Sequence, residues 1–117
     1  MKINFVNEIS DQQIINGCIM GERKMQQLLY QRFSQPMFAV CLRYAKDYHS
    51  AEDVLQDGFV KVFRHIGNFR KEGSFEGWIR RIFVNTSIEH LRKSVNLYSI
   101  VNNEGEAIDI KDESVYD

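Results

Sequence analysis

The residues of this chain that could support binding chemistry gather between positions 50 and 93. Aromatic residues border a short segment, residues 68–74, that contains Arg70, Lys71 and Gly73. Cations can follow the phosphates of a nucleic-acid strand, and aromatic rings offer faces for unpaired bases, with about 1–3 kcal/mol gained per stacked base. The combination is typical of a surface that handles single-stranded nucleic acid.

A second candidate surface lies on residues 75–93, which the apolar spacing predicts to be helical. Trp78, Arg81, Asn85 and Arg92 recur along one stripe of this helix, at i, i+3, i+7 and i+14. Two guanidinium groups on one stripe would need partners if buried, so the stripe predicts a working surface. The amide of Asn85 could read an adenine edge. For Trp78 we favour a core anchor, and an amide bonded to the helix backbone is an equal alternative for Asn85.

Catalytic chemistry has little support in the sequence. His49, His65 and His90 fall in separate segments without an HxxxH pair, and no Gly-rich loop precedes a Lys-Ser or Lys-Thr pair. Asp53 and Asp57 share a helix face, but two carboxylates without a third ligand more often form a solvated or protein-binding face. We therefore expect no enzyme activity, no catalytic residues, no metal site and no cofactor.

Length and composition limit the class of protein. With 117 residues and 44% hydrophobic content, the chain can form one domain with a modest core. No apolar run approaches the roughly 18 residues of a membrane span, and the N-terminus lacks a signal-peptide pattern. Cys18 and Cys41 lie in apolar helical patterns without CxxC spacing. This favours two reduced core thiols in a cytoplasmic protein.

The net charge of −1 hides an uneven distribution. Residues 58–93 carry eight basic and three acidic groups, whereas residues 95–117 carry one basic and six acidic groups. A basic block followed by an acidic segment suggests a polyanion-binding surface with a competitor beside it. A solvated helix face followed by an ordinary linker explains the charges equally well.

Two helices are expected in the first half of the chain to position these surfaces. Ser10 is a plausible N-cap for a short helix that ends near Gly21. A longer helix follows over residues 22–47, and Pro36 is expected to kink or break it.

Two further helices are expected in the second half. Ser50 and Asp53 resemble a capping box that opens a helix ending near Gly67. Its expected core stripe consists of Leu55, Phe59, Val62, Phe63 and Ile66. Ser74 is expected to cap a last helix that runs to about Lys93. The apolar face of that helix changes sides midway, which predicts a central position with packing from two directions.

The predicted fold class is therefore all-α, a compact bundle of about four helices. The domain would span residues 1–94, and residues 95–117 would form an acidic linker or tail.

Three motifs in this region resemble the second conserved region of extracytoplasmic-function (ECF) sigma factors, the small members of the bacterial sigma-70 group. As they stand here, they are AEDVLQDGFVKVFRHI (51–66), NFRKEGSFEGWIRRI (68–82) and VNTSIEHLRK (84–93). Family members show the same order of an A-E-D-x-x-Q-[DE]-x-F helix, an F-R-x-x-x-x-F-x-x-W loop and helix start, and an N-x-x-x-[DE]-x-x-R-[KR] end. The resemblance implies a sigma-70 region 2-like fold.

The resemblance also implies two binding surfaces. In the family, the A-E-D helix docks on the clamp helices of the RNA polymerase β′ subunit. The matching polymerase-binding residues are Asp53, Gln56, Asp57, Val60 and Arg64. The family's loop captures a base flipped from the non-template strand of the promoter minus-ten element, and the next helix lies beside that strand. The matching DNA-binding residues are Asn68, Phe69, Arg70, Lys71, Gly73, Ser74, Trp78, Arg80, Arg81, Asn85, Arg92 and Lys93.

The implied function is that of a sigma factor domain that binds core polymerase and melts the minus-ten element in transcription initiation. Family members continue into a second helical domain that reads the minus-thirty-five element, and this sequence shows no such domain. We therefore expect a fragment or a truncated relative. The main alternative is a helical protein-interaction module without a DNA role, held for example by an anti-sigma protein. A less favoured alternative is a double-stranded DNA-binding protein that reads the major groove with its last helix.

Overall fold

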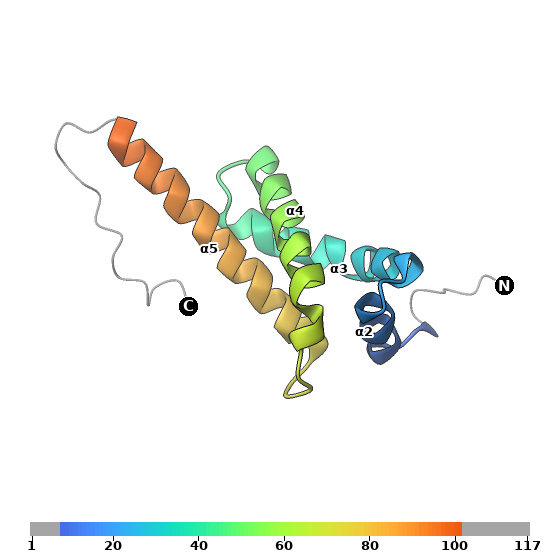
Figure 1. Cartoon of the computed structure of the whole chain (residues 1–117). Coiled ribbons are helices and arrows are strands. Elements are labelled where there is room, and N and C mark those ends of the chain that lie inside the picture. Colours follow the sequence, from blue (N-terminus) through green and yellow to red (C-terminus); the bar gives the residue numbers. More distant parts are fainter. Residues whose placement is uncertain (1–7, 102–117) are drawn as a thin grey trace.

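A computed structural model describes residues 8–101 of the chain, with side chains as far as Leu97. Within this range the elements are α2 (Asp11–Ile19), α3 (Arg23–Tyr44), α4 (Tyr48–His65), the 3-10 turn η1 (Ile66–Asn68) and α5 (Phe75–Val101) (Figure 1). No strand occurs among residues 8–101. The prediction of an all-α bundle of about four helices is confirmed. Residues 102–117, which hold most of the predicted acidic tail, lie outside the described residues.

Helix α2 begins as the sequence predicts and is tied to α3. The Ser10 hydroxyl accepts from the Gln13 backbone N–H at 3.1 Å, and the Gln13 side chain accepts from the Ser10 N–H at 2.9 Å. On α3, Arg32 donates to the Asp11 carboxylate at 2.9 Å and to the Ile9 carbonyl at 2.5 Å. These contacts fix the segment before α2 against the longer helix.

Helix α3 runs unbroken through Pro36, so the predicted break is wrong. A proline inside a helix costs about 3 kcal/mol because it removes one hydrogen bond and crowds the preceding turn. Phe33, Met37 and Val40 flank it and are buried in the core. Their packing in the core offsets that cost, so the helix continues past Pro36.

Helix α4 begins three residues earlier than predicted. Asp47 is its N-cap, and its carboxylate accepts from the Ser50 backbone N–H at 2.7 Å. The predicted capping box at Ser50 is therefore wrong, because Ser50 lies inside the first turn. The backbone hydrogen bond from Ser50 holds the pKa of Asp47 below its usual range. A carboxylate is well suited to this end of a helix, where free N–H groups and the helix dipole attract negative charge.

Helix α5 begins after Ser74, whose hydroxyl accepts from the Gly77 N–H at 2.9 Å, and the predicted cap is confirmed. The helix continues to Val101 instead of ending near Lys93. No Gly or Pro occurs between residues 84 and 101 to stop it. Its last turns project beyond the other helices, and Leu97 is exposed there (Figure 1).

The core lies where α3, α4 and α5 meet. Helix α5 packs against both α3 and α4, as its two apolar faces predict. The predicted stripe of α4 is buried at Phe59, Val62 and Ile66, whereas Leu55 and Phe63 are half-buried. Sequence reasoning missed the small residues that bring α4 close to its neighbours. These buried residues are Ala51, Val54 and Gly58.

Both cysteines are free and buried, as predicted. Burial raises the pKa of the Cys18 thiol and of the Cys41 thiol to about 11. Neither thiol is therefore a reactive thiolate near neutral pH. Among residues 8–101, no helix combines the length and the apolar character that a bilayer crossing requires.

Candidate functional site

A hollow opens between η1 and the start of α5, at the segment that the sequence singled out. We call it the loop hollow; its volume is about 430 Å³. Gly73 has a φ of +134°, a conformation that L side chains rarely adopt, so a residue with a Cβ would strain this turn. The residues that line the loop hollow are Asn68, Phe69, Arg70, Glu72, Gly73, Ser74, Gly77, Trp78 and Arg81.

Aromatic rings form the apolar wall beside this hollow. The Trp78 ring lies 5.5 Å from that of Phe69 and 5.9 Å from that of Phe75, nearly parallel to the latter at 13°. Phe75 is buried and meets Phe33 of α3 edge-on at 5.7 Å. Trp78 is half-buried, packs on the core and lines the hollow. Trp78 therefore combines the favoured role of a core anchor with a position on the surface of the hollow.

A second hollow of about 470 Å³ adjoins the first along α5, and we call it the helix hollow. Its lining is Gly77, Arg80, Arg81, Val84 and Asn85. Gly77 and Arg81 line both hollows, so the two form one surface from the loop to Asn85. Asn85 is exposed, which leaves its amide accessible from this side.

Three of the predicted DNA-binding cations lie outside these hollows. Lys71 is exposed on the loop but lines neither hollow. Arg92 is half-buried, two turns of α5 beyond Asn85. Lys93 borders a different cavity, where the end of α3 and the start of α4 meet the far half of α5. The structure thus groups the predicted residues from Asn68 to Asn85, except Lys71, on the two hollows and separates them from Arg92 and Lys93.

The predicted polymerase-binding residues all lie on α4, and three of them border a groove with α3. We call this set the docking face: Asp53, Gln56, Asp57, Val60 and Arg64. Four of the five side chains are exposed, and Val60 is exposed to 48%. The groove has a volume of about 540 Å³, and its lining includes Asp53, Gln56, Val60 and the exposed Tyr30 of α3.

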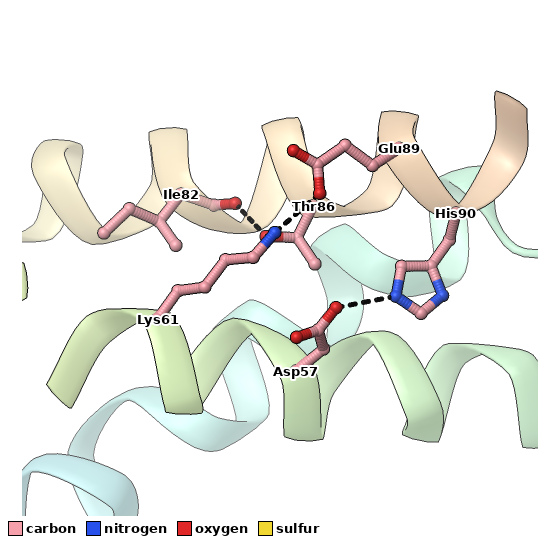
Figure 2. A network of polar contacts seen from close by, with 6 residues as sticks. All are labelled: Asp57, Lys61, Ile82, Thr86, Glu89 and His90. Atoms are coloured by element: carbon pink, nitrogen blue, oxygen red, sulfur yellow. Dashed lines mark hydrogen bonds and ion pairs between the residues drawn. The ribbon is translucent and has the colours of Figure 1, made fainter. Parts of the chain in front are cut away.

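Asp57 differs from the rest of the docking face because it contacts α5. Its Oδ2 lies 2.9 Å from Nε2 of His90 (Figure 2). An ionised carboxylate can only accept, so the ring nitrogen donates. This hydrogen bond, supported by the charges of Lys61, His90 and Lys93, holds the pKa of Asp57 below its usual range. The sequence did not predict this contact within the chain, although the Asp57 side chain stays partly exposed.

A second bridge joins the same two helices one turn further along (Figure 2). Lys61 Nζ lies 2.6 Å from the Glu89 carboxylate and 3.3 Å from the Thr86 hydroxyl. The buried Thr86 hydroxyl donates in turn to the Ile82 carbonyl at 2.7 Å. The two bridges fix α4 and α5 side by side.

Sequence reasoning missed three residues that line the hollows. Glu72 brings a carboxylate to the loop hollow, and Gly77 supplies the open space shared by both hollows. Val84 is half-buried and also borders the helix hollow. The position of Gly77, three residues after the cap Ser74 on an exposed helix face, was the available signal.

Together these features define a helical domain with a cation-bordered hollow on one helix and an acidic docking face on another. The family model for Sigma-70 region 2 matches residues 29–96, which covers the loop, both hollows and the docking face. The chain belongs to the Sigma-70 region 2 family, and the resemblance to ECF sigma factors is confirmed.

Curated relatives carry sigma factor names. The chain is 33% identical over 81 residues to the RNA polymerase sigma-H factor of Pseudomonas aeruginosa. That alignment covers 69% of this chain and 42% of the relative. It is 32% identical over 84 residues to the ECF RNA polymerase sigma-E factor of Haemophilus influenzae. That alignment covers 72% of this chain and 44% of the relative. The sigma-E factor of Escherichia coli is 30% identical over the same length. The chain spans less than half the length of these relatives.

Proposed function

We propose that this chain is the region 2 domain of an RNA polymerase sigma factor and acts in transcription initiation, in the cytoplasm. It binds core polymerase through the docking face and holds promoter minus-ten DNA on the surface formed by the two hollows. One observation carries the proposal: the loop hollow combines aromatic rings, cations and open space, and it continues along α5 to Asn85.

In this proposal, melting results from trapping an open strand. Extruding a base from duplex DNA costs about a few kcal/mol, and a pocket that binds the extruded base offsets this cost. The loop hollow holds the flipped non-template base, with Trp78 as the ring nearest to it. Arg80 and Arg81 follow the phosphates along α5, and Asn85 contacts the next base edge. No catalytic residue, cofactor or ATP takes part, so the protein is not an enzyme.

Docking on polymerase uses the groove between α3 and α4. Exposed apolar side chains, Tyr30 and Val60, lie beside the polar groups Asp53 and Gln56. An apolar centre with a polar border is the usual composition of a protein interface. The clamp helices of the β′ subunit are the expected partner, and an anti-sigma protein is a second candidate for the same chain.

Binding of fluorescent oligonucleotides tests the DNA half of the proposal. A set of single-stranded oligonucleotides, each changed at one base, is compared with the matched duplexes. We expect the chain to bind the single strands more tightly than the duplexes. Asn85→Ala should lose about 1–3 kcal/mol of discrimination between bases at one position of the oligonucleotide. Helicity should not change. Arg23→Gln, an exposed arginine at the start of α3 and outside both hollows, is the control and should bind normally.

Two outcomes would favour the alternatives. Equal or tighter binding to duplex would favour a major-groove reader, and an unchanged base preference in Asn85→Ala would count against the role of this amide. Binding to core polymerase without any measurable binding to single strands would favour a pure protein-interaction module.

A further inference from the structure

We propose that His90 is a positioning residue for polymerase docking: its ring holds the Asp57 carboxylate in place at the edge of the docking face. This inference rests on the proposed function, because it takes the docking face to be the surface that binds polymerase. His90 itself lies on α5, outside both hollows and outside the docking face.

The exposure of the two side chains supports this role. Asp57 retains 42% of its side-chain exposure and His90 retains 33%, so the pair lies at the surface. His90 binds Oδ2 of Asp57, and Figure 2 shows Oδ1 pointing away from the ring. The carboxylate can therefore be held by α5 and still accept from a partner.

The nearest cation on α4, Lys61, is bonded to another carboxylate and does not hold Asp57 in place. Lys61 lies one turn along α4, where a residue four positions away attracts a carboxylate. Lys61 is itself held by Glu89 at 2.6 Å. Without the ring of His90, the Asp57 side chain would be free to rotate, and ordering it again would oppose docking. His90 therefore orders the carboxylate before the partner arrives.

Three variants separate positioning from simple helix pairing. His90→Leu removes the donor but keeps much of the side-chain volume. His90→Gln places an amide N–H at similar reach, so it should restore the hydrogen bond. Glu89→Gln weakens the other bridge between the same helices and does not touch Asp57, which makes it the matched control.

The experiment measures the affinity of the full chain for core RNA polymerase by fluorescence anisotropy, together with the thermal stability of each variant. We expect His90→Leu to bind about tenfold more weakly, as is usual for residues coupled by direct contact. His90→Gln should stay within about twofold of wild type. Asp57→Asn should lose affinity for core polymerase by a similar factor. The double variant Asp57→Asn with His90→Leu should lose no more affinity than either single variant.

Three outcomes would overturn the inference. Wild-type affinity in His90→Leu would show that the ring has no role in docking. An equal loss in Glu89→Gln would assign the effect to loosened packing of α4 and α5, and additive losses in the double variant would show that the two residues act separately. If the wild-type chain itself did not bind core polymerase, the proposed docking function would fail too, and that result is distinct from a loss confined to the variants.

Discussion

The hydrogen bond from His90 to Asp57 gives one pair of side chains a measurable pH dependence. Its effect lowers the pKa of Asp57 below the ordinary value of 3.8. A carboxyl group whose pKa is lower in the folded state stabilises the fold above its unfolded-state pKa. That contribution is lost as the pH falls through the folded-state pKa. The contact should therefore stabilise the domain at neutral pH and not in strong acid.

Asp57→Asn should accordingly be less stable than wild type at pH 7 but not in strong acid. We expect a difference in the free energy of unfolding below about 1 kcal/mol, because both partners are partly exposed. The difference should begin to shrink near the ordinary value of 3.8 and vanish below the folded-state pKa. Urea unfolding followed by circular dichroism at several pH values measures it. Glu52→Gln, an exposed carboxylate on the same helix, is the control, and a pH-independent gap for Asp57→Asn would contradict the assignment.

Individual site residues could be predicted where the sequence motif and the helical period agree. Trp78, Arg81 and Asn85 share a stripe, and the structure places them on adjoining hollows. Asp57 could not be placed in this way, because its partner lies 33 positions later in the chain. The period of α4 gives the direction of a side chain from its own helix, but it does not say which other helix lies beside it.

The crossing of α4 and α5 depends on the absence of one side chain. Gly58 lies in the middle of α4, where a glycine lowers helix stability by about 1 kcal/mol relative to alanine. A Cβ at this position would lie 2.3 Å from the ring of Phe83, which is buried and packs on Phe59 at 5.0 Å. The close approach of the two helices therefore requires glycine.

Gly58→Ala should destabilise the domain by about 1–3 kcal/mol, because the Phe83 ring has no open space into which it can move. Chemical denaturation provides the measurement. Gly67→Ala is the matched control: nothing lies within 4 Å of a Cβ at that position, and its stability should stay close to that of wild type. Equal stability of Gly58→Ala and wild type would mean that the helices can separate at no cost.

The existence of each helix could be read from the sequence, but several ends could not. Ser10 and Ser74 act as caps as predicted, and each hydroxyl accepts from the backbone N–H three positions later. Asp47 takes precedence over Ser50, because two cap residues stand three positions apart and local pattern does not choose between them. The continuation of α5 to Val101 was not predicted, although residues 94–101 contain neither Gly nor Pro and no acidic residue.

The charge of the whole molecule is divided between surfaces. The segment 58–93 is basic and supplies the cations of both hollows, whereas the docking face on α4 includes the carboxylates Asp53 and Asp57. Opposite charges on separate faces allow two partners to bind at once without competing for one surface. The proposed function, with polymerase on one helix and DNA on another, would use this separation.

The surface proposed to bind DNA should therefore show a salt dependence set by its cations. Arg70, Lys71, Arg80 and Arg81 could neutralise about four phosphates, which predicts a slope near −3 for the logarithm of affinity against the logarithm of salt concentration on single strands. Lys71→Gln should reduce this slope by about 0.7 and weaken all sequences alike, since Lys71 lies on the loop without lining a hollow. Asn85→Ala is the contrasting variant and should change base preference while leaving the slope intact. Titration of oligonucleotide binding with NaCl tests both, and a slope near zero would exclude phosphate contacts as the source of affinity.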